Sequence, residues 1–488
     1  MKDVAPFGIV ILLVATALLV AVLSNRLSER IMVPAPALFL VVAAVASDLF
    51  PVLGTLPIKT DERIVTVALI LILFDGGMHI GWHRFRTVAG AVVWIGVAGT
   101  VVTAAAVAVA AHALFGFEWR TALLIGTALA PTDPAVVFSV LGRREISGRS
   151  GTILEGESGA NDPVGIALMV ALLSASGGGL HAVAGGVAEF VVQMVVGAAV
   201  GGVGGYLLLV FVRRVPLPNE ALYPIRTLAC AAIIYGLATA LHGSGFLAVF
   251  LAGILVGDAR APYKREVERF ASGLSSVAEI VAFTVLGLTI SLRDVLRPDE
   301  LWVGLALAAL LIVFIRPVLV GLLILKLDLD RGERLFVLWS GLKGAVPILL
   351  GAFILSGGVT DARRLYGIVF LVVLVSVVVQ GGLVPTFARL LRVPMRNIEL
   401  EPWSLGMRFQ DEPRGLHRHL VDAGSPADGT TIADLDLGED AWISLVSRNG
   451  QLVQVRGNTA LRAGDEVLAL GDPEMNLDRI FRPARPPR

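Results

Sequence analysis

Prolines that flank polar side chains interrupt the apolar stretches of this chain. The first interruption reads Pro-Thr-Asp-Pro at 131–134. Each proline removes a backbone hydrogen-bond donor and clashes with the preceding turn, so the pair must break a helix here. The freed carbonyl groups, the Thr132 hydroxyl and the Asp133 carboxylate are hard oxygen ligands, which suit an alkali cation. The sequence therefore predicts a cation site at this break.

A second cluster of polar residues within an apolar run reads Glu-Ser-Gly-Ala-Asn-Asp-Pro at 157–163. Residues four apart share one face of a helix, so Ser158 and Asp162 present oxygen atoms to one region, and Asn161 lies beside them. A charged side chain within an apolar span is costly, which makes each one a functional candidate. Asp162 is the preferred carrier, because one buried carboxylate can hold a proton and a cation in turn. We expect the monovalent cation to bind Asp162, Asp133, Thr132 and Ser158.

Other ionisable side chains also fall within apolar runs. Lys343 lies in a further interrupted segment, Gly-Leu-Lys-Gly-Ala-Val-Pro, and Glu157 is the expected counter-ion in a structural salt bridge. Asp75 lies near one end of its run and is a further candidate for the site. Arg316 precedes a proline, with Glu279 as its candidate partner, and we interpret these two as supporting structure rather than chemistry.

The composition defines the setting of these residues. The chain has 488 residues, of which 56% are hydrophobic and 16% charged, with a mean hydropathy of +0.79. These values exclude a soluble enzyme, a disordered chain and a secreted disulfide scaffold. A membrane span needs about 17–25 apolar residues. Thirteen such runs predict an all-α polytopic membrane protein, at 6–24, 33–53, 63–80, 88–115, 120–141, 150–175, 183–212, 223–241, 245–258, 271–292, 300–325, 332–356 and 365–390.

The loops and the order of the breaks add topology. Lys and Arg gather in the loops of one side, which places the N-terminus outside and the C-terminal tail in the cytoplasm. If the first six and last six spans form two units joined by the seventh, the second unit is inverted. The broken span at 120–141 then corresponds to the broken span at 332–356. Paired interrupted helices in an inverted repeat indicate a midplane site of a secondary transporter.

The C-terminal tail is acidic and reads as a separate, soluble α/β domain. Strand-like runs at 441–446, 451–455 and 466–471 are joined by turns, which predicts a hairpin and a closing strand. The pattern resembles the C-terminal subdomain of TrkA-type regulators of potassium conductance. The resemblance implies a regulatory module that often dimerises and binds a small ligand, such as a nucleotide. The alternative is a tail that only solubilises the protein. The expected domains are a membrane domain at 1–396, a linker at 397–411 and the tail domain at 412–484.

Three motifs in order resemble the NhaP-type, electroneutral branch of monovalent cation:proton antiporters. They are Pro-Thr-Asp-Pro at 131–134, Glu-Ser-x-x-Asn-Asp at 157–162 and Gly-Leu-Lys-Gly-Ala-Val at 341–346. The resemblance implies a homodimer in the plasma (inner) membrane and a core built around two crossed, unwound helices. It also implies that Asp162 binds cation and proton in turn.

The same resemblance assigns roles to the neighbouring residues. Thr132, Asp133, Ser158 and Asp75 would contribute to the site, and Glu157 would pair with the basic residue at 343. Two positions depart from the family pattern. Residue 343 is commonly Arg in the family and is Lys here, which removes the bidentate fork. The acid at 75 is often Glu and is Asp here, which shortens its reach.

The leading function is therefore potassium/proton antiport, regulated by the tail, with no cofactor beyond the transported ions and no nucleic acid as partner. One carboxylate that accepts either one proton or one cation gives electroneutral 1:1 exchange. Sodium/proton antiport is the alternative. A potassium channel would need a filter such as Thr-Val-Gly-Tyr-Gly, and none is present. An intramembrane serine protease would need a His base near Ser158, and no His lies mid-span.

Overall fold

The structure is a computed structural model that falls into two compact units, Met1–Trp403 and Ser404–Arg488. It describes residues 19, 34–54, 57–141, 144–146, 149–175, 180–259, 261–325, 327, 329–397, 416–435, 437–438, 441–448, 451–471 and 477–482. The first expected span, 6–24, and the expected linker, 397–411, lie outside these residues except for Leu19 and Asn397.

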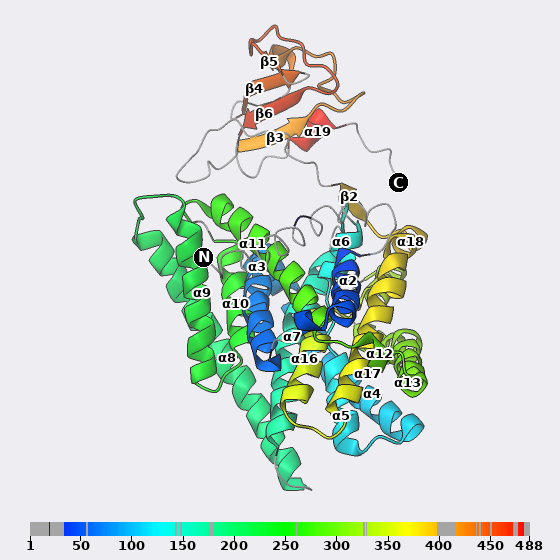
Figure 1. The fold of residues 1–488 in the computed structure, drawn as a ribbon. Coiled ribbons are helices and arrows are strands. Elements are labelled where there is room, and N and C mark those ends of the chain that lie inside the picture. The colour runs from blue at the N-terminus through cyan, green and yellow to red at the C-terminus, as the bar shows by residue number, and fades with distance from the viewer. Residues whose placement is uncertain are drawn as a thin grey trace, which may run out of the picture. The chain divides into compact units, whose positions relative to one another are not determined.

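The first unit is a bundle of helices (Figure 1). Its α-helices are α2 (Ala35–Leu49), α3 (Ile58–Val93), α4 (Thr100–Phe115), α5 (Trp119–Leu129), α6 (Ala135–Leu141), α7 (Arg149–Ser174), α8 (Leu180–Arg214), α9 (Leu222–Ala240), α10 (Gly245–Gly257), α11 (Lys264–Leu288), α12 (Leu292–Val295), α13 (Pro298–Leu310), α14 (Gly321–Ile324), α15 (Arg331–Trp339), α16 (Ala345–Ser356), α17 (Ala362–Val375) and α18 (Gly382–Leu390). The π-helical segments η2 (Trp94–Gly99), η3 (Leu311–Val320) and η4 (Ser376–Gly381) connect some of them. A 3₁₀ turn, η1 (Pro51–Gly54), follows α2, and the strands β1 (Arg144–Ile146) and β2 (Met395–Asn397) pair antiparallel.

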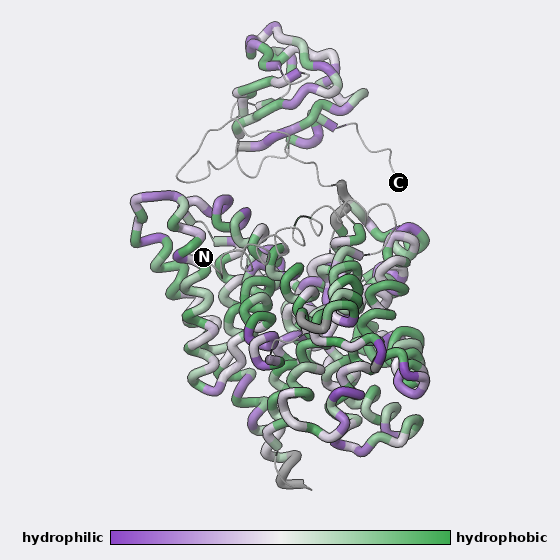
Figure 2. Tube along the Cα trace, viewed as in Figure 1, coloured by the Kyte–Doolittle hydropathy of each residue, from purple (hydrophilic) through white to green (hydrophobic). Residues whose placement is uncertain are grey.

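Hydrophobic residues run along most of these helices, and hydrophilic ones gather at helix ends and turns (Figure 2). Within the described part of the chain, six helical segments are long and apolar enough to cross a membrane: Ile58–Phe115, Ala184–Arg214, Leu222–Ala240, Lys264–Leu288, Pro298–Ile324 and Ala362–Leu390. Three shorter helices, α2, α10 and α16, are also apolar. Large apolar side chains such as Trp302 and Ile233 are exposed on the surface of the bundle, which is favourable where the surface faces lipid.

The expected runs 63–80 and 88–115 lie on two helical stretches that meet at a kink within α3, and the second stretch continues through η2 into α4. The kink is at Gly81, whose φ of 67° lies in the left-handed region that favours glycine. The Asp258 carboxylate, just after α10, lies against this glycine and accepts the His83 backbone N–H, so it caps the helix that restarts there.

Both expected helix breaks are present in the structure. Helix α5 ends at Leu129 and α6 begins at Ala135, and between them lies the proline-flanked segment. Helix α15 ends at Trp339 and α16 begins at Ala345, so residues 340–344 of the segment that contains Lys343 are also non-helical. The unwound segments confirm that the prolines and glycines stop both helices.

The tail unit contains a four-stranded antiparallel sheet in the order β3-β6-β4-β5 (Figure 1). Its elements are β3 (Leu416–Leu420), η5 (Ile432–Asp434), β4 (Trp442–Arg448), β5 (Gln451–Val453), β6 (Glu466–Leu470) and the short helix α19 (Asp478–Phe481). The predicted hairpin is confirmed by the β4–β5 pair, and the predicted closing strand by β6. Val446, Val467, Ala469 and Phe481 form part of a separate core.

Arg448 and Asp465 form the shortest ion pair among the described residues of the tail. Arg448 Nε and Nη2 each donate to one Asp465 oxygen at 2.7 Å, and the side chain of Asp465 is only 1% exposed. The hydrogen bond to Asp465 raises the pKa of the Arg448 guanidinium above its usual value. The Arg462 backbone N–H donates to the same carboxylate at 2.8 Å, which ties the turn to the sheet.

Arg448→Ala is expected to destabilise the tail by about 3 kcal/mol, because it removes the positive partner of a buried carboxylate and leaves it only the Arg462 backbone N–H among the described residues. Limited proteolysis of the full-length protein should show earlier cleavage within the tail. Arg456→Ala removes an exposed arginine of the same sheet domain and serves as the matched control. Equal protease resistance in the two variants would contradict a structural role for the Arg448 pair.

Candidate ion-binding site

The two helix breaks meet at one place in the bundle. The Asp133 backbone N–H donates to the Leu342 carbonyl at 2.8 Å. The Lys343 ammonium donates to the Ala130 and Pro131 carbonyls, both at 3.0 Å. Carbonyl groups that the prolines released from one helix are therefore satisfied by a cation from the other. This crossing of unwound segments is the centre of the candidate site.

The Asp133 carboxylate caps both half-helices that begin at the crossing. Its Oδ1 accepts the Ala135 backbone N–H at 2.9 Å, at the start of α6. It also accepts the backbone N–H of Ala345, at the start of α16. Unpaired N–H groups and the helix dipole make each helix N-terminus favourable for a negative charge. The carboxylate that the sequence analysis expected at the cation site thus also holds the two half-helices together.

The crossing leaves no room for a side chain at position 344. A Cβ atom added to Gly344 would collide with the Asp133 carboxylate. Gly344→Ala should therefore separate the two breaks, at a stability cost of about 1–3 kcal/mol for overpacking, and should strongly reduce transport. Thermal unfolding in detergent and transport in vesicles measure the two effects. Gly90→Ala is the control, because a Cβ there has no neighbour within 4 Å.

Asp162 lies in α7 beside the crossing. The residue is only 7% exposed, and its Oδ1 atom is buried without a hydrogen-bond partner in the described part of the chain. It interacts electrostatically with Asp133 and Lys343. A carboxylate oxygen that has lost water and gained no donor is unfavourable. A proton or a cation bound at this oxygen removes that penalty.

Thr132 and Asn161 join the first break to α7. The Asn161 amide Nδ2 donates to Thr132 Oγ1 at 2.6 Å, and the Thr132 backbone N–H donates to Asn161 Oδ1 at 3.3 Å. Ser158 is buried in the same helix, one turn before Asp162. The structure thus brings together Thr132, Asp133, Asn161 and Asp162 near one point, as the motif spacing indicated.

The predicted pair between Glu157 and Lys343 is wrong. Glu157 instead pairs with Arg316, whose Nη2 lies 2.9 Å from Oε1 and 3.1 Å from Oε2 of Glu157. Arg316 also donates through Nε to the Leu338 carbonyl at 3.0 Å and through Nη2 to the Val337 carbonyl at 3.3 Å. The guanidinium has enough donors to bind a carboxylate and the last carbonyls of α15 at once, which an ammonium cannot do in this geometry.

The same contacts correct the expected partner of Arg316. Arg316 is paired with Glu157 and not with Glu279. The Oε1 atom of Glu279 is buried and has no hydrogen-bond partner among the described residues.

Two polar residues of η4 were missed by the sequence analysis. The Ser376 hydroxyl accepts the Lys343 backbone N–H at 3.0 Å and donates to Gln380 Oε1 at 2.9 Å. The Gln380 amide in turn donates to the Trp339 carbonyl. This chain holds the backbone at the second break. The signal was available, because Ser376 and Gln380 are polar residues one turn apart in an otherwise apolar run.

Asp75 belongs to a separate cluster. Its carboxylate accepts the Ser272 hydroxyl of α11 at 2.9 Å and lies 3.4 Å from His79 Nδ1. Ser275, also in α11, donates to the same carboxylate. The polar contacts of Asp75 are thus with α11 and with its own helix, and not with the residues of the crossing.

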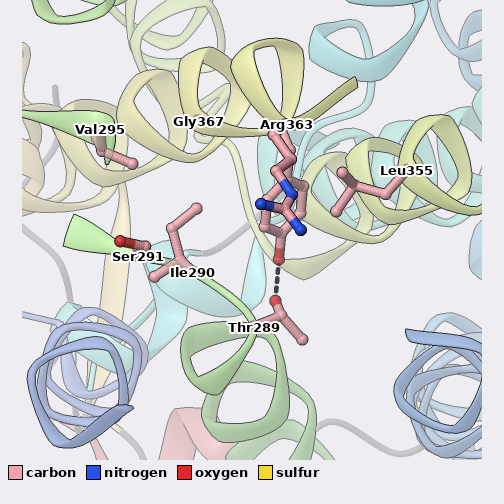
Figure 3. Close-up of a pocket in the computed structure, with 8 residues that line it drawn as sticks. Thr289, Ile290, Ser291, Val295, Leu355, Arg363 and Gly367 are labelled. Atoms are coloured by element: carbon pink, nitrogen blue, oxygen red, sulfur yellow. Dashed lines mark hydrogen bonds between the residues drawn. The ribbon is translucent and has the colours of Figure 1, made fainter. Parts of the chain in front are cut away.

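A cavity of about 210 Å³ lies where α11, α16 and α17 end or begin. Figure 3 shows its lining, which consists of Thr289, Ile290, Ser291, Val295, Leu355, Arg363, Tyr366 and Gly367. The Tyr366 hydroxyl bonds Thr289 and donates to the Leu286 carbonyl at 3.2 Å. Leu355 lies near the end of α16 and the crossing lies at its start, so this helix connects the cavity to the candidate site.

A bundle of apolar helices has two unwound segments that meet beside a buried carboxylate oxygen without a partner among the described residues, and this arrangement is typical of a secondary cation transporter. Comparison of the sequence with protein families identifies it further. The model of the transmembrane sodium/hydrogen exchanger matches residues 14–390, and the model of the TrkA-C domain matches residues 416–482. The chain belongs to the sodium/hydrogen exchanger family. It is a multi-pass membrane transporter rather than an enzyme, and it carries a TrkA-C domain.

Individual relatives agree with this assignment. The chain is similar to the K(+)/H(+) antiporter NhaP of Alkalimonas amylolytica, with 32% identity over 470 residues, 95% of this chain and 81% of the relative. It is 33% identical over 469 residues to the K(+)/H(+) antiporter NhaP2 of Shewanella sp. (strain ANA-3), covering 94% and 80% of the two chains. The structure of the sodium proton antiporter MjNhaP1 from Methanocaldococcus jannaschii matches with a TM-score of 0.65 and 22% identity, over 77% of this chain and 99% of that one. This last likeness confirms the NhaP-type fold.

Proposed function

We propose that this protein exchanges potassium ions for protons across the plasma (inner) membrane, with the N-terminus outside and the tail in the cytoplasm. The observation that carries the proposal is the buried Oδ1 of Asp162, which has no hydrogen-bond partner among the described residues and lies beside the crossing. Potassium is favoured because the relatives that match this chain over nearly its whole length, tail included, are named K(+)/H(+) antiporters. The positive loops favour this orientation.

The charges around the crossing favour electroneutral 1:1 exchange. Glu157 and Arg316 neutralise each other, and Asp133 and Lys343 are both held by backbone bonds. Asp162 then alternates between a proton and a cation. The Thr132 hydroxyl and the Ser158 hydroxyl supply further neutral oxygens to the cation. Each full cycle moves one cation in one direction and one proton in the other, so no net charge is transferred.

Sodium/proton exchange is the second candidate. The family model describes sodium/hydrogen exchangers, and the matched solved structure is a sodium proton antiporter. Thr132, Ser158 and Asp162 offer oxygen atoms that suit either ion, so the site chemistry alone does not select one.

The tail is proposed to regulate the exchange as a dimeric, ligand-binding module of a homodimer. Its match to the TrkA-C domain supports this role. Trp442 in β4 and Leu452 in β5 are 58% and 64% exposed, which provides apolar surface for a partner or a small ligand such as a nucleotide.

Proton flux in everted membrane vesicles tests the proposed exchange directly. A respiration-driven proton gradient is monitored with a pH-sensitive dye, and K⁺ and Na⁺ are added separately. Potassium should dissipate the gradient in vesicles with the wild-type protein and not in vesicles without it. A response to Na⁺ alone would mean that the transported ion is sodium and not potassium. If neither ion acts, deletion of residues 412–488 tests whether the tail holds the transporter inactive.

A further inference from the structure

Glu279 is a carboxylate of the membrane unit that the exchange cycle above does not use. It lies in α11, and its Oε1 atom is buried without a hydrogen-bond partner among the described residues. Its helix packs against α16, which begins at the crossing of the broken helices, and Glu279 interacts electrostatically with Asp133 there. An unpaired carboxylate oxygen away from water is unfavourable unless a positive charge or a proton compensates it.

The basic side chains at the crossing are already engaged. Arg316 binds Glu157 and two carbonyls of α15, and the Lys343 ammonium binds the carbonyls of Ala130 and Pro131. Asp133 adds a second negative charge close to Glu279. Glu279 therefore has no fixed positive charge beside it among the described residues, and its unpaired oxygen is left for a mobile cation or a proton.

Helix α11 connects Glu279 to the Asp75 cluster. Ser272 and Ser275 lie seven and four residues before Glu279, so all three share one face of the helix. Both serines bind the Asp75 carboxylate. Two helical turns, about 10 Å, separate Ser272 from Glu279 along the axis. The oxygen atoms of Ser272, Ser275 and Glu279 thus lie along one face of α11, between the Asp75 cluster and the crossing.

We infer that Glu279 forms a second binding site for a monovalent alkali cation, which the ion occupies between the Asp75 cluster and Asp162. The inference rests on the proposed exchange of an alkali cation for protons, and it adds a waiting position to that exchange. The cation at Glu279 moves on to Asp162 when the proton leaves, so the 1:1 ratio is unchanged. The carboxylate is a ligand here and need not carry the transported proton.

Binding of radioactive rubidium, a potassium analogue, to the purified full-length protein in detergent tests this second site. Glu279→Gln should raise the rubidium concentration for half-saturation about tenfold, equivalent to about 1.4 kcal/mol. Glu279→Asp keeps the carboxylate and should show a smaller shift. Glu189→Gln is the matched control, because that exposed carboxylate in α8 accepts the Gln193 amide at 3.3 Å and has no contact with the crossing among the described residues. Size-exclusion elution shows whether each variant is folded. If Glu279→Gln is not folded, the comparison is made with Glu279→Asp.

The outcomes separate this inference from the proposed function. Equal rubidium binding by wild type and both Glu279 variants overturns the second site, and the vesicle assay still decides potassium/proton exchange independently. If the wild type binds radioactive sodium but not rubidium, the proposed ion is wrong, and the same variants are compared with sodium. A wild type that binds neither ion overturns both proposals.

Discussion

Asp162→Asn is expected to reduce cation-driven proton movement at least about 100-fold, equivalent to about 2.7 kcal/mol. The amide has the shape of the carboxylate, but it can neither carry the exchanged proton nor neutralise a cation. The buried Oδ1 of Asp162 has no hydrogen-bond partner among the described residues, so the substitution breaks no bond to that atom and the fold should be retained. Proton flux in everted vesicles measures the loss, with membrane content determined by immunoblot.

Substitutions of Asp133 provide the contrast. Asp133→Asn keeps an oxygen that can accept the Ala135 N–H, so the cap at α6 survives in part and measurable exchange should remain. Asp133→Ala removes the cap from both half-helices and should lower thermal stability as well as transport. Full exchange by Asp162→Asn together with an inactive Asp133→Asn would identify Asp133 as the carrier instead.

The helix breaks could be predicted from the sequence because their cause is local. Pro131 and Pro134 remove backbone donors wherever the chain folds, and the structure ends α5 and restarts α6 around them. The grouping of Ser158, Asn161 and Asp162 follows equally from helical spacing. The tail strands could be predicted for the same reason, since β4, β5 and β6 are short strand-forming runs separated by turns.

The partners of buried charges could not be predicted in this way, because they depend on how distant helices pack. Lys343 was assigned a carboxylate, yet its ammonium binds two carbonyls that the prolines of the other break set free. Asp133 was expected at the cation site, and the sequence did not indicate that its carboxylate also binds the N–H groups that begin two half-helices. A sequence shows which side chains carry charge, but it does not show which backbone N–H and C=O groups at a helix break will bind them.

The corrected pairing predicts strong energetic coupling between Glu157 and Arg316. Removing either side chain leaves the other charge buried and unpaired, at a cost of about 3–5 kcal/mol. Glu157→Gln and Arg316→Gln should therefore each destabilise the protein strongly, and the double variant should lose much less than the sum of the two. Lys343→Met combined with Glu157→Gln should show a smaller coupling than the Glu157–Arg316 pair, because Lys343 and Glu157 interact electrostatically but form no hydrogen bond with each other.

Equilibrium unfolding of the purified protein by SDS titration in detergent micelles measures both cycles under one condition. The discriminating quantity is the difference between the two coupling energies, so errors common to all variants cancel. Coupling of Glu157 to Lys343 that equals or exceeds its coupling to Arg316 would contradict the observed pair and restore the pairing expected from the motifs. Strong coupling to Arg316 alone means that Lys343 acts through the carbonyls of the first break. In that case Lys343→Met should disturb the position of Asp133 and reduce transport, even though the Glu157–Arg316 pair remains intact.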